Sequence, residues 1–419
     1  MERALLVTIK FKHDRQAWSV EDMAEELEQL SFTACIEAVD NVTSISEKPT
    51  PNFLIGRGKT EELALLCQEL GVDTIIFSHD LSGTQQRNLE EVIGCKTVDR
   101  TQLILDIFAR HAKSPEGKIQ VELAQLQYLL PRLVGKGIML SRLGGGVGTR
   151  GPGEQKLEVD RRRIRKRIDK LKDDLDHVFL HRQNIRKKRK ESAMPTVALV
   201  GYTSAGKSTL LNALTNADQA VSGGLFTTLD TLYRVLQLPN GEKIVISDTV
   251  GFLHNLPHHL IEAFRATLEE VLEADLLIHV LDVKHSQVYE HNKAVLDVLK
   301  ELKAEQKPMI TALNKIDLLD DKMWLSRLKE DFINPVAISA KTGENLDFLL
   351  KEIQKNFISR MANIEIMIPH QRMDLVSLFH REGKVKEILY LDKGIRIKLS
   401  LPKLLIQKLL HSKEIEEVS

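Results

Sequence analysis

The residues best suited to chemistry lie in the segment GYTSAGKS, residues 201–208, which fits the pattern GxxxxGK[ST]. Gly201 and Gly206 let the backbone curl so that its N–H groups face a phosphate group, and the start of the following helix adds partial positive charge. Lys207 can then reach the β and γ phosphates of a nucleotide, while the Ser208 hydroxyl ligates Mg²⁺. The residues expected to bind the nucleotide here are Gly201, Ser204, Ala205, Gly206, Lys207, Ser208 and Thr209.

Two further segments predict contacts to the metal and to the γ-phosphate. In the segment DTVG, residues 248–251, we expect Asp248 to bind Mg²⁺ through water and the Gly251 N–H to contact the γ-phosphate. The segment 222–230, which contains two glycines, has the composition of a switch loop, and Thr228 would bind the metal only when the γ-phosphate is present. The predicted metal ligands are therefore Ser208, Thr228 and Asp248, and the predicted catalytic residues are Lys207, Thr228 and Gly251.

The segment NKID, residues 314–317, predicts that the base is guanine. Its Asp317 carboxylate can accept two hydrogen bonds from the N1–H and 2-amino groups of guanine, a donor pair that adenine lacks. The Lys315 stem can lie along the base, and the segment SAK, residues 339–341, can supply an N–H group to guanine O6. The residues expected around the base are Asn314, Lys315, Asp317, Ser339, Ala340 and Lys341.

The residue after Gly251 is Phe252, where Ras-like proteins place a glutamine that orients the attacking water. Phenylalanine cannot orient water, so we expect slow hydrolysis by the chain alone, with help from elsewhere in the chain or from a partner. The alternative is that a nearby polar residue such as His254 already does this task.

These motifs require an open sheet that brings strand ends together. Residues 196–358 alternate apolar runs, which predict buried strands, with amphipathic stretches, which predict helices on both faces of a mostly parallel sheet. Each motif follows an apolar run, and ligands gather at the carboxyl ends of such strands. The sequence therefore predicts a P-loop GTPase domain of α/β class over residues 193–360.

The ends of the chain predict two smaller domains. Residues 1–99 alternate between strand-like and helix-like runs, which predicts a small α/β domain with one strand over residues 32–38. Residues 52–59 weakly resemble a phosphate loop, although a turn before a helix is the better interpretation, so ATP binding by this domain stays an open alternative. Residues 361–419 predict a small α+β domain whose target the sequence does not indicate.

Residues 100–192 predict a helical hairpin, with helical stretches over residues 101–140 and 155–190 on either side of a glycine-rich loop. The loop is slim and basic, and the second stretch carries runs of arginine and lysine, which suits contact with RNA phosphates and single-stranded RNA. The alternatives are a solvated helix face and a plain linker. The residues expected to contact RNA are Arg142, Gly145, Gly146, Arg150, Arg161, Arg162 and Arg163.

Composition excludes several other classes of protein. The chain has 419 residues, 42% of them hydrophobic, which predicts two to three globular domains rather than a disordered or collagen-like chain. No apolar run reaches the roughly 18 residues of a membrane helix, and the N-terminus lacks the pattern of a signal peptide, so we expect a cytoplasmic protein. Cys35, Cys67 and Cys95 lack paired spacing, and we expect three small buried side chains rather than a disulfide or zinc site.

Beyond the nucleotide motifs, the chain resembles the HflX-type GTPases, which are ribosome-associated members of the translation-factor class. The resemblance covers residues 1 to about 360 and rests on segments inside and outside the GTPase domain, namely residues 117–126, Pro131-Arg132-Leu133, 141–146, 151–154, 160–163, 225–230, 248–252 and 256–259. It implies binding to the large ribosomal subunit and its RNA, with GTP, GDP and Mg²⁺ as ligands and no DNA partner. A monomer suits a factor that enters a ribosomal cleft.

Two positions depart from that family's pattern. Ser204 stands where the family usually has asparagine, which in related GTPases helps to hold a stimulating K⁺ ion, so activation by K⁺ is uncertain. Thr231 stands where the family usually has proline after the switch aspartate, so the geometry of the switch loop can differ. Neither change touches Lys207, Ser208 or Asp317.

The leading hypothesis is a GTPase, stimulated by the large ribosomal subunit, that splits or rescues stalled ribosomes. A ribosome-assembly GTPase shares the same domains and would differ by binding immature subunits. A GTP sensor that recruits a protein partner would show no multiple turnover. An RNA helicase would need ATP binding by the N-terminal region, which makes it the weakest of the four hypotheses.

Overall fold

The computed structural model describes residues 2–12, 18–133, 152–191, 194–215, 225–226, 231–254, 257, 260, 265–319, 322–358, 361–391, 394–411 and 416–417. These residues form three sheets: a parallel sheet of four strands, a sheet of six strands, and an antiparallel sheet of four strands. The chain divides into two compact units. The first comprises residues 1–179, 222–230 and 255–266, and the second comprises the other residues.

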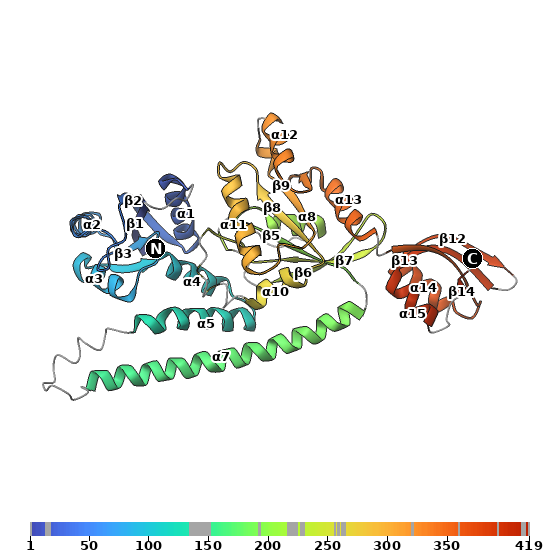
Figure 1. Cartoon of the computed structure of the whole chain (residues 1–419), viewed down its shortest axis with the longest axis horizontal. Helices are drawn as coiled ribbons and strands as arrows, with labels where there is room; N and C mark the ends of the chain where they lie inside the picture. Colours follow the sequence, from blue (N-terminus) through green and yellow to red (C-terminus); the bar gives the residue numbers. More distant parts are fainter. Residues whose placement is uncertain are drawn as a thin grey trace. The chain divides into compact units, whose positions relative to one another are not determined.

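The N-terminal sheet has the strand order β2-β1-β3-β4, and every neighbouring pair is parallel (Figure 1). Helices α2 and α3 cover one face, where Leu63 and Leu89 pack on Leu5 and Ile75 in an apolar core. The predicted α/β fold is confirmed. Its elements are β1 (Glu2–Phe11), α1 (Val20–Thr33), β2 (Ile36–Ser46), α2 (Arg57–Leu70), β3 (Thr74–Phe77), α3 (Gly83–Ile93) and β4 (Lys96–Asp99).

Two predictions in this region have different outcomes. The strand predicted over residues 32–38 is present as β2, but it begins only at Ile36, because α1 continues to Thr33 and the chain reverses at Cys35, which has φ of 57°. The apolar residue that suggested a strand, Phe32, is 75% exposed on the helix, and Cys35 is exposed rather than buried. The turn before a helix is confirmed, because Gly56 is the N-cap of α2.

In the described part of the chain the sheet is followed by the helices α4 (Arg100–His111), α5 (Pro115–Arg132) and α7 (Pro152–Glu191). The single helix predicted over residues 101–140 is wrong, since Ser114 caps a new helix whose first residue is Pro115, a favoured start position. The predicted hairpin is confirmed by an apolar seam in which residues of α5 meet residues of α7. The seam comprises Ile119, Leu123, Leu126, Leu130, Ile164, Ile168, Leu171 and Leu175.

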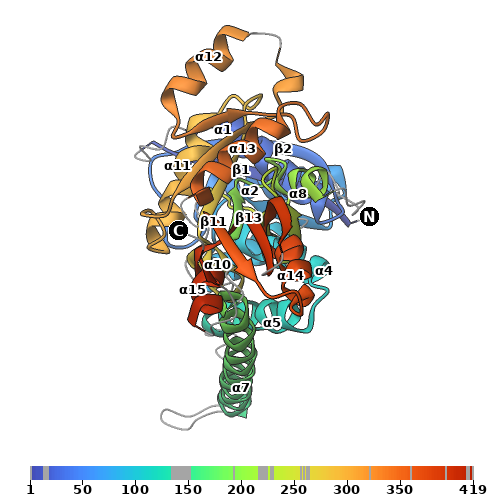
Figure 2. The same ribbon diagram turned by 90° about the vertical axis from the view of Figure 1, so that its right-hand side faces the viewer.

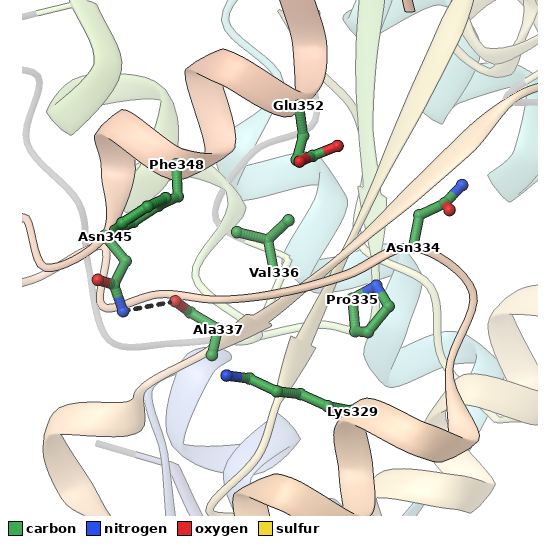
Figure 3. Close-up of a pocket in the computed structure, with 8 residues that line it drawn as sticks. All are labelled: Lys329, Asn334, Pro335, Val336, Ala337, Asn345, Phe348 and Glu352. Atoms are coloured by element: carbon green, nitrogen blue, oxygen red, sulfur yellow. Dashed lines mark hydrogen bonds between the residues drawn. The ribbon is translucent and has the colours of Figure 1, made fainter. Parts of the chain in front are cut away.

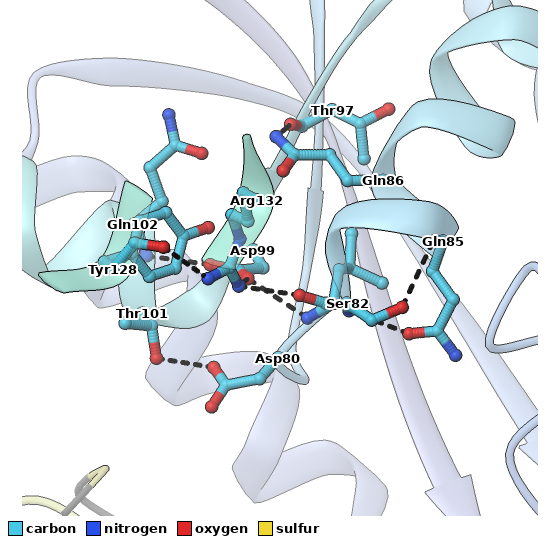
Figure 4. Close-up of polar contacts among 11 residues, drawn as sticks. Asp80, Ser82, Gln85, Gln86, Thr97, Asp99, Thr101, Gln102, Tyr128 and Arg132 are labelled. Atoms are coloured by element: carbon cyan, nitrogen blue, oxygen red, sulfur yellow. Dashed lines mark hydrogen bonds and ion pairs between the residues drawn. The ribbon is translucent and has the colours of Figure 1, made fainter. Parts of the chain in front are cut away.

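The last residue of α5 is fixed to the sheet by a buried ion pair (Figure 4). Arg132 donates to the Asp99 carboxylate at 2.8 Å and to the Leu81 carbonyl at 2.6 Å, and its guanidinium lies 3.4 Å from the centre of the Tyr128 ring. Asp99 also accepts the N–H groups of Leu81 and Gln102, so it caps α4 as well. Burial raises the pKa of Asp99, while these hydrogen bonds and Arg132 lower it.

The central sheet has the order β10-β9-β8-β5-β7-β6, and only the β6–β7 pair is antiparallel (Figure 1). Helices α8 and α13 pack on one face, while α11 and α12 pack on Leu281 and Leu313 of the other. The predicted, mostly parallel GTPase sheet is confirmed. Its elements are β5 (Thr196–Gly201), α8 (Lys207–Thr215), β6 (Leu232–Gln237), β7 (Lys243–Asp248), α10 (Arg265–Glu273), β8 (Leu276–Asp282), α11 (Val288–Glu301), β9 (Met309–Asn314), α12 (Lys322–Asp331), β10 (Pro335–Ala337) and α13 (Leu346–Phe357).

The C-terminal sheet has the order β12-β13-β11-β14, and Figure 2 shows it with its two helices. Side chains of α14 and α15, including Phe379 and Leu409, pack on Ile366 and Ile397 of one face. The predicted α+β fold is confirmed. Its elements are β11 (Met361–Ile368), α14 (Met373–Glu382), β12 (Lys384–Leu391), β13 (Gly394–Pro402), α15 (Lys403–His411) and β14 (Glu416–Glu417).

The buried Asp99–Arg132 pair predicts a large loss of stability when one partner is removed. The Asp99 carboxylate is 1% exposed, and Arg132→Met removes the cation that pairs with it. The free energy of unfolding of the N-terminal unit should therefore fall by about 3–5 kcal/mol. Urea unfolding followed by the fluorescence of Trp18, in a Trp324→Phe background that removes the other tryptophan, measures this unit.

Two further variants make the test specific. Asp99→Asn combined with Arg132→Met removes the unpaired charge and should recover part of the loss. Arg167→Met breaks the exposed pair with Glu122 on the same hairpin and should cause a much smaller change. Equal losses for Arg132→Met and Arg167→Met would contradict the assignment.

Candidate nucleotide-binding site

The loop between β5 and α8 is built on two glycines that no other residue can replace. A Cβ at Gly201 would lie 2.4 Å from the Val280 carbonyl oxygen, and a Cβ at Gly206 would lie 2.3 Å from the Asn314 side-chain nitrogen. Gly206 also has φ of 97°, a left-handed conformation. Between them, Ser204 is exposed with φ of 61°, so the loop turns outward there and carries its hydroxyl to the surface.

Lys207 begins α8 and is held inside this loop. Its ammonium donates to the carbonyl oxygens of Gly201 at 3.0 Å and Tyr202 at 2.9 Å. Burial lowers the pKa of Lys207 to about 8, against a smaller opposing effect of Asp248. An ammonium with three N–H groups and two such acceptors retains a third donor for a phosphate oxygen.

The two described metal-ligand candidates lie together. The Ser208 hydroxyl donates to the Asp248 carboxylate at 2.6 Å, and Asp248 is fully buried at the end of β7. A hydroxyl and a carboxylate are hard oxygen ligands of the kind that Mg²⁺ prefers, so these residues fit that ion. The third candidate, Thr228, lies outside the described residues.

Asn314, at the end of β9, joins the phosphate loop to the base-binding loop. Its side-chain nitrogen donates to the Ala205 carbonyl at 2.8 Å, and its side-chain oxygen accepts the Ala340 N–H at 2.9 Å. Asn314 is 2% exposed, so both hydrogen bonds are shielded from water. The sequence placed Asn314 near the base but did not predict that it holds the two loops together.

The other guanine-site residues also meet at this edge of the sheet. The Ser339 hydroxyl donates to the Asp317 carboxylate at 2.6 Å, which leaves the second carboxylate oxygen able to face a base. The Lys315 ammonium forms an ion pair with Asp282 at 2.6 Å. Asp282 was missed in the sequence analysis, although its position at the end of the apolar run of β8 was a usable signal. Lys341 is exposed beside them.

Phe252 points away from solvent and is 1% exposed. Phe252 forms a parallel bridge with Tyr202 of the phosphate loop. The main chain of Gly251 also lies close to this loop, because a Cβ on Gly251 would be 2.8 Å from Thr203 and 3.1 Å from the Lys207 ammonium nitrogen. The backbone of Gly251 is therefore next to Lys207, where the sequence predicts the γ-phosphate, while the Phe252 side chain is unable to contact water.

Part of the predicted switch loop packs within the N-terminal unit. The Leu225 N–H donates to the Thr33 hydroxyl at 2.9 Å, and the Phe226 ring lies edge-on against Phe108 with the centroids 4.6 Å apart. Leu225 and Phe226 are 3% and 2% exposed, so this contact buries both side chains. This contact could not be predicted from the sequence, because nothing local distinguishes these two residues from other apolar loop residues.

The predicted RNA contacts are only partly described. Arg161, Arg162 and Arg163 lie on α7, where Arg161 and Arg163 are within 3.9 Å and 3.7 Å of acidic residues of the same helix. These separations are long for charge-assisted hydrogen bonds. The Arg163 side chain is 78% exposed and can turn toward a phosphate, whereas the Arg161 side chain is only 27% exposed. The predicted contacts Arg142, Gly145, Gly146 and Arg150 lie outside the described residues.

A pocket of about 530 Å³ lies at the free edge of β10, away from these motifs (Figure 3). It contains none of the predicted nucleotide-binding residues. Pro335 lacks an N–H group and the Asn345 side chain already donates to the Ala337 carbonyl at 3.0 Å, so the edge is protected from pairing with another strand. We assign the nucleotide to the motif-bearing strand ends and not to this pocket.

The described residues offer neither a metal centre nor a membrane span. Among them, no group of three or more His, Cys, Asp or Glu side chains is placed to hold a metal ion. None of the helices in the described part of the chain combines the length and the apolar composition that crossing a membrane requires.

Comparison with protein families matches nearly the whole chain. Residues 21–109 match the GTP-binding GTPase N-terminal family, and residues 111–189 match the GTP-binding GTPase middle region. Residues 196–315 match the 50S ribosome-binding GTPase family, and residues 326–404 match the HflX C-terminal domain.

The chain is similar to individual proteins over most of its length. The chain is 46% identical to GTPase HflX of Caldanaerobacter subterraneus, over 95% of this chain and 90% of the relative. It is 40% identical to GTPase HflX of Escherichia coli, over 96% and 94%. It is also similar to the crystal structure of a GTP-binding protein from Sulfolobus solfataricus in complex with GDP, with 25% identity, coverage of 86% and 99%, and a TM-score of 0.46.

The lowered pKa of Lys207 predicts how nucleotide affinity depends on pH. The phosphate oxygens of GDP favour the charged form of the Lys207 ammonium, so GDP binding raises the pKa of Lys207. At pH values where Lys207 of the free protein is deprotonated, GDP binding must therefore take up a proton. GDP affinity should be constant from pH 6.5 to 7.5 and fall above about pH 8, which a fluorescent GDP analogue can measure. Lys207→Arg, whose side chain stays charged, should show little dependence up to pH 9. If GDP affinity fell with pH in the same way in both proteins, the deprotonation of Lys207 would not be its cause.

The Lys315–Asp282 pair predicts a residue needed for nucleotide affinity. Asp282→Asn removes the charge that orients Lys315, and since both side chains are partly exposed, the GDP dissociation constant should rise about three- to tenfold. The preference for GDP over ADP should remain, because Asp317 is intact. Asp331→Asn, which removes the carboxylate that binds the Tyr289 hydroxyl in the same domain, is the matched control and should leave affinity unchanged. Unchanged affinity in Asp282→Asn would refute the role.

Proposed function

The chain belongs to the HflX family of GTPases, and from this premise we propose that it binds the large ribosomal subunit and splits or rescues stalled ribosomes in a GTP-dependent cycle. The family membership makes it a GTPase with a ribosome-binding GTPase domain. The further steps of the proposal are that the subunit stimulates slow intrinsic hydrolysis, and that the protein acts as a cytoplasmic monomer.

One observation carries the proposal. Residues 225–226 lie in sequence between α8 and β6 of the GTPase domain, yet they are buried against α1 and α4 of the N-terminal unit. A loop that rearranges with the γ-phosphate would therefore pull on the unit that carries the basic hairpin. Such a link would give the nucleotide state a physical route to the predicted RNA contacts.

The site residues support the hydrolytic half of the cycle. The phosphate loop and the Lys207 ammonium would hold the β and γ phosphates, and the Gly251 N–H would contact the γ-phosphate. Ser208 and Asp248 would hold Mg²⁺, with Thr228 added in the GTP state, and the ion would neutralise charge that develops on the phosphates. Asp317 would select guanine. The buried Phe252 is consistent with slow hydrolysis in the absence of a partner.

The hairpin would supply the RNA-binding half. The arginine run of α7, which comprises Arg161, Arg162 and Arg163, and the glycine-rich loop that follows α5 in the sequence would contact ribosomal RNA near the peptidyl-transferase region. Arg132 fixes the end of α5 to the sheet, and the loop follows α5 in the sequence. Binding through phosphates should weaken steeply as the salt concentration rises.

The contact between Phe226 and Phe108 predicts that a substitution of Phe226 uncouples GTP hydrolysis from the ribosome. Phe226→Ala removes the buried ring that contacts Phe108, so stimulation of GTP hydrolysis by large subunits should fall at least fivefold, while GDP affinity stays within twofold. Multiple-turnover phosphate release, with and without purified large subunits, measures the stimulation. Separation of intact ribosomes on sucrose gradients then tests splitting.

Two controls define the outcome. Lys207→Ala should abolish turnover under both conditions, and Phe32→Ala, which removes a ring that is 75% exposed on α1, should behave as the unchanged protein. If large subunits do not stimulate the unchanged protein, the ribosome-triggered mechanism fails and a GTP sensor becomes the better hypothesis. Preferential binding to immature subunits would instead favour a role in assembly.

A further inference from the structure

The second residue of the phosphate loop, Tyr202, reaches across to the segment that follows Asp248. Residues 248–254, here named the switch II segment, pair with this loop through two main-chain hydrogen bonds. The Phe252 N–H donates to the Gly201 carbonyl at 3.1 Å, and the Thr203 N–H donates to the Phe252 carbonyl at 2.9 Å. A third hydrogen bond uses a side chain, because the His254 N–H donates to the Tyr202 hydroxyl at 3.1 Å.

The third bond depends on the identity of residue 202. The two main-chain bonds are open to any residue at that position, whereas the bond to His254 requires a hydroxyl at the end of a long, rigid side chain. Tyrosine supplies that reach, and phenylalanine would keep the ring without the acceptor. Ser208 connects the phosphate loop to Asp248 at the start of the switch II segment, and the Tyr202 side chain connects the same loop to His254 at its end.

The ring of Tyr202 is held in place from its other side. It stacks on His291 of α11, with the ring centroids 3.8 Å apart and the planes 8° from parallel, and His285 contacts His291 at 4.3 Å. Tyr202 is 5% exposed and His291 is 6% exposed. Burial lowers the pKa of His291 to about 3, so its ring is neutral at physiological pH and stacks on tyrosine as an uncharged partner.

The segment that Tyr202 holds contains Gly251, whose N–H the sequence predicts at the γ-phosphate. The main chain of Gly251 lies beside the Lys207 ammonium. Because Phe252 and Leu253 are both 1% exposed, His254 is the first residue after Gly251 that is only partly buried. Movement of the switch II segment away from the loop would withdraw both the Gly251 N–H and the His254 side chain.

We propose that Tyr202 is a positioning residue for GTP hydrolysis, which holds the switch II segment against the phosphate loop through the His254 N–H and so keeps Gly251 and His254 at the γ-phosphate. The tyrosine does not touch the nucleotide in this role. It raises the fraction of bound GTP that is in the reactive arrangement, and it leaves the affinity for the β-phosphate and for guanine to other residues. The proposal concerns the GTPase activity alone and does not depend on the ribosome.

The test compares the rate of hydrolysis with nucleotide affinity in the full-length protein. Tyr202→Phe keeps the stacked ring and loses the acceptor, and an ordinary hydrogen bond corresponds to an expected fall of about five- to tenfold in the single-turnover rate at saturating GTP. The GTP concentration at half-maximal rate and the GDP dissociation constant should stay within twofold. The melting temperature should change little, because the substitution leaves the core packing intact.

Two matched variants separate positioning from a general structural effect. Tyr289→Phe removes a tyrosine hydroxyl from the same domain, where it binds Asp331 at 2.6 Å, and should leave the rate unchanged. His291→Leu keeps the Tyr202 hydroxyl but removes the stacked ring, and should lower the rate in the same direction with GDP affinity retained. A wild-type rate in Tyr202→Phe overturns the proposal. Parallel losses of rate, GDP affinity and thermal stability also overturn it, since they indicate a structural role.

Discussion

The carboxamide of Asn314 is the interaction on which the nucleotide site depends, because one side chain fixes the distance between the phosphate loop and the base-binding loop. Its donor binds the Ala205 carbonyl and its acceptor binds the Ala340 N–H. Aspartate at this position has no donor and would place a carboxylate against that carbonyl, at the cost of an unpaired buried polar group. A Cβ on residue 206 would lie only 2.3 Å from the same carboxamide nitrogen, so the position of Asn314 requires glycine at residue 206.

The geometry around Asn314 follows from the parallel sheet. The loops after β5, β7, β8 and β9 all leave the same edge, which brings Lys207, Asp248, Asp282 and Lys315 together although they are far apart in the sequence. Within this edge, charged side chains are paired or hydrogen-bonded rather than left alone in the protein interior. Lys207 is bound by two carbonyls and Asp248 by Ser208, so the site is already organised to receive charged phosphates.

The motifs and the fold class could be predicted from the sequence because both depend on local patterns. A glycine at a close approach, an apolar run before a motif and an amphipathic helix are each visible in a few residues. The break between α4 and α5 was also visible, since Ser114 and Pro115 form a capped helix start, but the continuous apolar spacing was given more weight. The end of α1 was misplaced because Phe32, an aromatic residue of a type common in strands, is in fact exposed on the helix.

The residues that the sequence could not assign are those whose role arises from tertiary contact. Asp282 is an ordinary strand end until Lys315 is beside it. Leu225 and Phe226 are ordinary loop residues until Thr33 and Phe108 cover them. These contacts join positions that are tens to hundreds of residues apart, and neither propensity nor periodicity carries that information.

The C-terminal domain illustrates why topology alone does not assign function. Its order of elements, β-α-β-β-α-β, is a ferredoxin-like arrangement shared with domains that stack RNA bases on aromatic residues of an open sheet face. Here the central strands β11 and β13 contain no aromatic residue. Alternation places Glu365 and Lys398 opposite the apolar core, where they pair with each other at 3.8 Å and Lys398 pairs with Glu387 at 3.3 Å. RNA binding at this face would have to break those pairs without gaining a stacked base, which favours the basic hairpin for the proposed contact with RNA.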